Sequence, residues 1–456
     1  MKEKQAGRYE MDMCSGPILR KMLAFAVPLV CSSVLQLLFN AADIVVVGRF
    51  AGDHSLAAVG SNTSMINLLT NLFIGLSIGA NVLTGICYGA KREKDLSETV
   101  HTSMLLSIFS GIFLAIGGFL CAHQILVWMQ APPEVLDLAT LYLKIYFLGM
   151  PAIMVYNFGS AILRAVGDTK RPLFYLTGAG VINFILNLFF VIVLRMDVAG
   201  VAAATVISQC VSALLVVRCM MREESGIRLY LNRLHIHKDK LIRILKIGLP
   251  AGFQGVIFAL SNVMIQSSIN IFGATVVAGN SAAANIEGFV YVSMNAFHQA
   301  TISFTSQNMG GGKYERIRRI LLSGQFCAIL AGLILGNACV FFGKPLLGIY
   351  SSSPEVIEAG MVRLHAISTV YALAGMMDVM VGALRGIGYS ILPMIVSLIG
   401  VCGFRILWLA TIFRMDEFHN VWTVYISYPI SWVMTTIAHV ICFIWAWRRI
   451  QRRRNE

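Results

Sequence analysis

Apolar residues gather in twelve long runs that are separated by short polar segments. A helix of about 20 apolar residues crosses the roughly 30 Å hydrocarbon layer of a membrane, and helices satisfy their own backbone groups there. The pattern therefore predicts an all-α integral membrane protein with twelve transmembrane helices. The approximate limits of the predicted spans are 18–47, 56–87, 101–129, 135–160, 173–194, 199–221, 243–271, 281–308, 319–347, 357–384, 391–413 and 422–447.

Composition supports the membrane interpretation. Of 456 residues, 57% are hydrophobic and only 13% are charged, about half the usual charged share of a soluble protein. So few charges exclude a soluble enzyme, a disordered chain and a fibrous protein. None of the ten cysteines forms a C-x-x-C pair and most lie in apolar runs, so we expect buried thiols rather than a disulfide framework or a metal site.

The basic residues fall mainly on one side of the predicted spans. The net charge is +13, and 29 of the 36 Lys and Arg lie on one side against four on the other, counted from the span limits above. The positive-inside rule then places both termini in the cytoplasm of a multi-pass plasma-membrane protein. A basic surface facing anionic lipid explains this charge better than nucleic-acid binding, which we do not expect.

The two halves of the chain repeat one another. Leu245–Pro250 matches Leu23–Pro28 at an offset of 222 residues, and Leu384–Gly388 matches Leu163–Gly167 at an offset of 221. A register held over about 150 residues indicates a duplication. Each half has six spans, so the repeats are parallel. Two such lobes are typical of transporters that work by alternating access, although a purely structural scaffold is the alternative.

The repeat and the charge pattern predict five segments. They are a cytoplasmic N-terminal segment at 1–17, an N-lobe at 18–221, a cytoplasmic linker at 222–242, a C-lobe at 243–447 and a cytoplasmic basic tail at 448–456.

Three motifs carry a resemblance to a known family. Residues 36–52 read QLLFNAADIVVVGRFAG, residues 163–172 read LRAVGDTKRP, and residues 306–313 read SQNMGGGK. In place on twelve spans, they resemble the multidrug and toxic compound extrusion (MATE) family of the multidrug/oligosaccharidyl-lipid/polysaccharide flippase superfamily. The resemblance implies a V-shaped pair of six-helix bundles. It also implies a cation-coupled antiporter that exports amphipathic, often cationic compounds.

Ionisable groups inside a membrane are costly and are therefore candidates for function. Asp43 in the first span, Asn183 and Asn187 in the fifth and Thr205 in the sixth lie at similar depth, roughly 8–11 Å from the outer side, and we expect them to converge. The resemblance implies that they form the N-lobe cation or proton site. Many family members carry Asp where this chain has Asn187, which favours protons over Na⁺ at Asp43, because hard cations favour anionic oxygen ligands. A structural role as a hydrogen-bond acceptor is the alternative for Asp43.

The C-lobe carries a different polar set. The position of Asp43 maps onto Ile265, whereas Glu287, Arg363 and Arg405 lie at matched depth in spans eight, ten and eleven. They predict an ionic network with either a structural or a substrate-binding role. Asp378, nearer the cytoplasmic end of span ten, is a candidate for substrate or cation contact, or else an interfacial carboxylate. Lys144 either partners Asp43 or reaches toward the membrane surface.

Further candidates concern the substrate. Methionines and aromatic residues suit an adaptable cavity for organic cations, and the residues placed there by position are Gln36, Phe39, Asn40, Tyr156, Phe158 and Met264. The expected partners are small-molecule substrates and membrane lipids, with no cofactor other than H⁺ or Na⁺, and a monomeric chain. The sequence lacks G-x-x-x-x-G-K-[ST] and a histidine cluster, so neither ATP drive nor an enzyme is favoured. A flippase or exporter of a lipid-linked saccharide or anionic metabolite remains the alternative.

Overall fold

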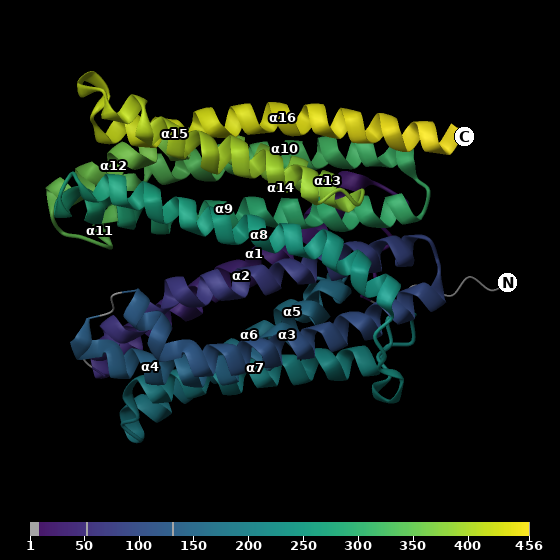
Figure 1. Ribbon diagram of the computed structural model, residues 1–456, viewed down its shortest axis with the longest axis horizontal. Coiled ribbons are helices and arrows are strands. Elements are labelled where there is room, and N and C mark those ends of the chain that lie inside the picture. The colour runs from purple at the N-terminus through teal and green to yellow at the C-terminus, as the bar shows by residue number, and fades with distance from the viewer. Residues whose placement is uncertain (1–8, 52, 130–131, 456) are drawn as a thin grey trace. The chain divides into compact units, whose positions relative to one another are not determined.

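A computed structural model describes residues 9–51, 53–129 and 132–455, and every regular element in them is a helix (Figure 1). The chain divides into two compact units. The first consists of Met1–Asp12 and Cys31–Gly252, and the second of Met13–Val30 and Phe253–Glu456. These dividing points differ from the proposed lobe bounds because two long helices, α1 (Ile18–Phe50) and α8 (Lys238–Asn270), each contribute to both units.

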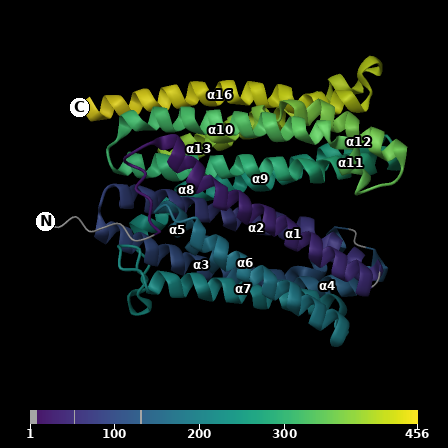
Figure 2. The same ribbon diagram turned by 180° about the vertical axis from the view of Figure 1, so that it is seen from behind.

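The first unit is built on helices packed lengthwise. In it α3 packs on α4 and α5, and α6 packs on α7; the same paths can be followed from behind in Figure 2. Buried apolar side chains form two clusters, one centred on residues such as Leu143 and Phe147 and one on Phe158 and Ile162. Its further elements are α2 (Asp53–Gly89), α3 (Glu93–Trp128), α4 (Pro133–Leu148), α5 (Met150–Ala165), α6 (Lys170–Leu188), the π-helix η1 (Phe189–Val193), α7 (Asp197–Met221) and the 3₁₀-helix η2 (Leu231–Arg233).

The second unit has the same kind of packing. In it α9 lies beside α10, and α13 packs against α9, α10 and α16. The elements are α9 (Ala274–Gly310), α10 (Tyr314–Phe341), α11 (Gly343–Gly348), α12 (Pro354–Ile367), η3 (Ser368–Val370), α13 (Ala372–Gly386), α14 (Ile391–Ser397), η4 (Leu398–Gly403), α15 (Phe404–Ala410), η5 (Ile412–Arg414), η6 (Asp416–Phe418) and α16 (Val421–Asn455). The residues proposed as a basic tail are thus helical up to Asn455, as the end of α16.

The predicted spans correspond to helices, with two differences. Among the described residues, nine helices are long and apolar enough to cross a membrane, or up to eleven if each of two bent pairs is one span. The bent pairs are α4 with α5, and α12 to η3 with α13; each bends by 47°. The remaining predicted span, α9, is 37 residues long but carries Glu287, His298 and a polar run from Thr305 to Asn308.

The duplication is visible in the backbone. Gly167 and Gly388 both adopt a left-handed conformation, with φ of 96° and 93°. Each amide donates to the carbonyl three residues earlier, Gly167 to Arg164 at 3.0 Å and Gly388 to Arg385 at 2.9 Å. Glycine suits this αL helix terminus because a Cβ disfavours positive φ. The breaks of the two bent pairs, at Gly149 and Tyr371, are also 222 residues apart.

Side chains of two motif segments hold chain connections in place. After the turn at Gly167, Asp168 Oδ1 accepts hydrogen bonds from the amides of Lys170 and Arg171, each at 3.1 Å, and its Oδ2 pairs with the Arg171 guanidinium. In the second unit, Gln307 accepts from the Met13 amide at 3.2 Å. These two motifs therefore fix the ends of helices and the N-terminal segment rather than forming a pocket.

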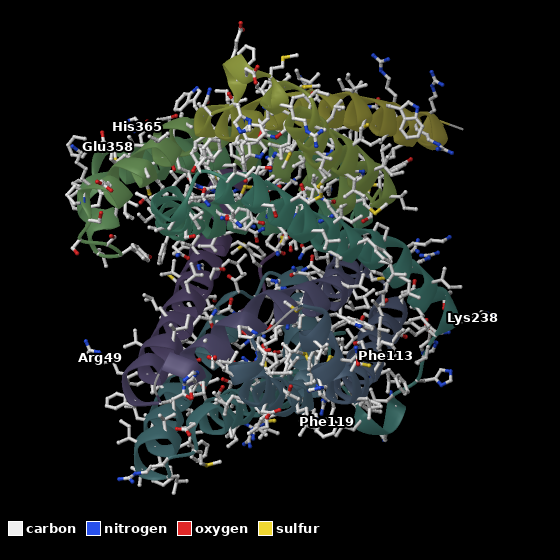
Figure 3. The ribbon with its side chains drawn as sticks, turned by 60° about the vertical axis from the view of Figure 1, so that its left-hand side comes forward. Arg49, Phe113, Phe119, Lys238, Glu358 and His365 are labelled. Carbon is white, nitrogen blue, oxygen red and sulfur yellow. The ribbon has the colours of Figure 1, made fainter. Side chains whose placement is uncertain are left out.

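The segment between α7 and α8 is fastened to α3. Lys240 Nζ lies 2.6 Å from Asp95 Oδ1, and the Tyr230 amide donates to His101 Nε2 at 3.1 Å. Arg49 and Lys238 lie at opposite ends of the first unit (Figure 3), as their assignment to opposite sides of a membrane requires.

Candidate functional site

The Asp43 carboxylate on α1 is held by two amides of α6. Asn183 Nδ2 donates to Oδ1 at 3.0 Å and to Oδ2 at 3.1 Å, and Asn187 Nδ2 also donates to Oδ1. Asn183 and Asn187 are one helical turn apart and therefore share a face. The convergence of these three residues, which we predicted from their depth, is present in the structure.

A glycine sets the approach of α1 to α6. A Cβ added to Gly180 would come within 1.9 Å of the Phe39 ring. Phe39 lies one turn before Asp43 on α1, and Gly180 lies one turn before Asn183 on α6. The contact between Phe39 and Gly180 therefore places the carboxylate beside the amides.

We expect Gly180→Ala to separate α1 from α6 and to weaken the hydrogen bonds to Asp43. Overpacking a close contact typically costs about 1–3 kcal/mol, which a lower thermal midpoint of the purified protein would report. Gly178→Ala on the same helix is the matched control, since a Cβ there meets nothing within 4 Å. Equal midpoints for the two variants would contradict this account of the contact.

The Asp43 site offers oxygen atoms as well as amide donors. Asn183 is 6% exposed and Asn187 is 0% exposed, and the Oδ1 atom of each is buried without a hydrogen-bond partner. With Asp43 ionised, both amides present their NH₂ groups to it. After an amide rotation, the same side chains present oxygen either to a protonated Asp43 or to a cation.

Thr205 does not join this cluster through its hydroxyl. Its Oγ1 donates to the Val201 carbonyl at 3.0 Å, within α7. Lys144 does not pair with Asp43 either: its Nζ lies 5.3 Å from the centre of the Phe119 ring, whose position is marked in Figure 3. The described first-unit site is therefore a carboxylate with two amides.

The second unit contains a buried ion pair. Arg363 on α12 contacts Glu287 on α9 through Nη2 to Oε2 at 2.7 Å, and its Nε lies 3.2 Å from each carboxylate oxygen. Arg363 Nη1 also donates to Asn280 Oδ1 at 2.6 Å, and the Tyr425 hydroxyl donates to the same oxygen at 3.2 Å. With Glu287 3% and Arg363 8% exposed, this fully bonded pair joins three helices.

Arg405 lies near this pair but bonds to other groups. Its Nε donates to Ser431 Oγ at 2.9 Å, and its guanidinium carbon lies 4.0 Å from the centre of the Tyr428 ring. The Arg363 guanidinium carbon lies 5.8 Å from that same ring centre. The predicted ionic network thus consists of the pair Glu287–Arg363, with Arg405 connected through an aromatic ring. Arg405 is 4% exposed, and its Nη2 is buried without a hydrogen-bond partner.

Asp378 belongs to a separate part of the second unit. Its backbone carbonyl lies 2.5 Å from His298 Nδ1, and Arg385 interacts electrostatically with its carboxylate. Arg385 in turn donates to Gln254 Oε1 at 2.7 Å. The structure does not connect Asp378 to Glu287 by a printed hydrogen bond, so the two acids are distinct candidates.

The proposed cavity residues divide into exposed and buried groups. Gln36 and Asn40 are exposed, and Met264 is 49% exposed. Tyr156 is buried and its hydroxyl donates to the Pro172 carbonyl at 3.1 Å. Phe158 is fully buried within the Phe158–Ile162 cluster, so it faces no open surface in this conformation.

Sequence reasoning missed several partners of the second-unit cluster. Asn280 lies seven residues before Glu287, two helical turns away on the same face of α9, and this spacing is a signal that could have identified it. Tyr425, Tyr428 and Ser431 have no such signal, because they belong to α16, which is far from α9 and α12 in the sequence.

Comparisons with known proteins agree with the duplicated helical architecture. The MatE family model matches residues 28–189 and 250–410, one match in each half. The probable multidrug resistance protein YoeA of Bacillus subtilis (strain 168) is 25% identical over 445 residues, 95% of each chain. The probable multidrug resistance protein NorM of Thermotoga maritima is 27% identical over 393 residues, 84% of this chain and 83% of the relative. A solved superfamily transporter from Pyrococcus furiosus, described as having a binding pocket of reverse polarity that suggests a different function, covers 96% of this chain and 97% of its own. Its TM-score is 0.88, at 22% identity.

Proposed function

Because the chain belongs to the MatE family, which is a family of membrane transporters, we propose that it is a secondary active multidrug exporter. It exchanges amphipathic, mostly cationic organic compounds for protons or Na⁺ across the plasma membrane, with both termini in the cytoplasm. Relatives named as multidrug resistance proteins support the substrate class. The predicted charge asymmetry supports the orientation.

The observation that carries this proposal is the carboxylate of Asp43 between two buried amides. A membrane-embedded acid is expensive to keep and is by default a candidate for ion coupling. Binding of a proton removes the charge that both amides now bond, so the contact between α1 and α6 must rearrange. The same residues therefore link ion binding to helix movement.

The test is export of a fluorescent organic cation from proteoliposomes that contain the full chain. A proton gradient and a Na⁺ gradient are imposed separately, with protein-free vesicles as the baseline. Export driven by either gradient supports the proposal. The drug-export proposal is overturned if neither gradient moves any of a panel of cations while the protein remains folded.

We expect Asn187→Asp to shift coupling toward Na⁺. The substitution adds a second carboxylate beside Asp43, and hard cations bind more strongly to anionic oxygen than to amide oxygen. The measurement is the Na⁺ concentration that gives half-maximal export, compared with that of the unchanged chain. Asn183→Asp is the companion variant, because its amide contacts both oxygens of the same carboxylate. Unchanged Na⁺ dependence in both variants would argue against a cation at this site.

A second candidate function rests on Arg405. A buried guanidinium with an unpartnered nitrogen suits an anionic group, and the polarity described for the Pyrococcus furiosus transporter points the same way. The alternative substrate is then a lipid-linked saccharide or an anionic metabolite. Export of an anionic fluorophore that is lost in Arg405→Gln, with no export of cations, would favour this alternative.

A further inference from the structure

A pocket with a volume of about 550 Å³ lies where the first turns of α10 meet the end of α16, within the second unit. Its wall contains two guanidinium groups, Arg318 and Arg319, and one carboxylate, Glu315. Trp447 and Leu322 supply aromatic and aliphatic surface. The pocket therefore combines positive charge with apolar walls at the end of a membrane-spanning helix pair.

The two arginines of this pocket are available to a ligand. Both are exposed, and neither forms a salt bridge with any residue that the structure describes. Three further arginines, Arg448, Arg449 and Arg452, follow on the adjoining helical end of α16. Helical order up to Asn455 holds this group of cations beside the pocket instead of leaving it on a loose tail. The local charge is strongly positive even with Glu315 included.

An apolar stripe leads away from the pocket along one face of α10. Leu322, Phe326, Leu330 and Leu333 follow at intervals of four, four and three residues, and they are 59%, 56%, 46% and 45% exposed. At 1.5 Å per residue the stripe is about 16 Å long, close to half of the roughly 30 Å hydrocarbon thickness. It thus spans about one leaflet.

We propose that this pocket binds the phosphate-bearing headgroup of an anionic phospholipid, with an acyl chain lying along the α10 stripe. Guanidinium groups pair well with phosphate oxygens, and basic pockets between transmembrane helices suit anionic headgroups. Trp447 occupies the interfacial position where tryptophan is enriched. The stripe distinguishes a lipid from a free phosphate, because only a lipid covers both the charges and the apolar face. The site is separate from the proposed transport function.

The test is titration of the purified full-length chain with phosphatidylglycerol or with phosphatidylcholine of the same acyl chains, followed by native mass spectrometry. We expect phosphatidylglycerol to bind more tightly, and Arg318→Gln/Arg319→Gln to weaken its binding by about 10- to 30-fold. The matched control is Arg218→Gln/Arg222→Gln, which removes two exposed arginines from the end of α7. Thermal midpoints confirm that each variant is folded.

Two single variants sharpen the test. Glu315→Gln removes the only carboxylate of the pocket wall and should tighten phosphatidylglycerol binding. Leu322→Asn should weaken binding of the lipid without affecting binding of inorganic phosphate. The proposal is overturned if both lipids bind equally, or if the arginine pair and its control behave alike. It is also overturned if Leu322→Asn leaves phosphatidylglycerol binding unchanged, which would indicate a site for phosphate alone.

Discussion

Replacement of Asp43 by Asn is expected to reduce gradient-driven export to the level of protein-free vesicles. The substitution keeps the size of the side chain but removes the negative charge that both Asn183 and Asn187 bond. A side chain that is permanently neutral can no longer gain or lose a proton, and it holds a cation poorly. The measurement is efflux of a fluorescent organic cation from proteoliposomes under separate proton and Na⁺ gradients.

Asp137→Asn is the matched control for this experiment. Asp137 is an exposed acid on α4 of the same unit, so its substitution changes the total charge equally and should leave export intact. Binding of the organic cation, measured without a gradient, separates a coupling defect from loss of substrate binding. Full gradient-driven export by Asp43→Asn would show that coupling uses another group, and Asp378 would then be examined next.

Loss of one partner of the Glu287–Arg363 pair is expected to cause the largest loss of stability. Removing one member of a buried ion pair typically costs about 3–5 kcal/mol, because the other charge remains buried without a partner. Arg363 would leave Glu287 and the Asn280 oxygen without their main donor. We therefore expect Arg363→Met to lower the free energy of unfolding by about that amount, as measured by denaturant titration in detergent.

A double-mutant cycle gives this prediction its control. Glu287→Leu/Arg363→Met removes both charges together and should be less destabilised than the sum of the two single variants. Glu358→Gln on the same helix changes an exposed acid that points away from the helices in Figure 3, so it should have little effect. Additive losses in the cycle would show that the two charges do not stabilise each other.

The sequence allowed most of the fold to be predicted because apolar length and charge placement are local properties. The twelve runs, the offset of 221 to 222 residues and the meeting of Asp43 with Asn183 and Asn187 follow from spacing alone. The bends at Gly149 and Tyr371 were not predicted, since no proline occupies either position and the apolar run continues through each bend.

The predicted side-chain contacts were less complete than the predicted helices. Depth arguments placed Arg405 beside Glu287, but depth does not fix the direction in which a side chain points around its helix. Arg405 instead contacts Ser431 and Tyr428 on α16. Thr205 lies at a suitable depth as well, yet its hydroxyl bonds to its own helix, an option that is always open to threonine in a helix.

The polarity of α9 bears on how this protein is made. The helix carries buried polar groups along its length, including Glu287, His298 and Asn308, and so it gains little free energy from entering lipid alone. Its packing partners α10, α12 and α13 are all synthesised after it. During translation, α9 must therefore wait in a protected or interfacial position until those helices emerge and pair with its polar face. The order of synthesis thus makes α9 the step at which membrane insertion depends most on later parts of the chain.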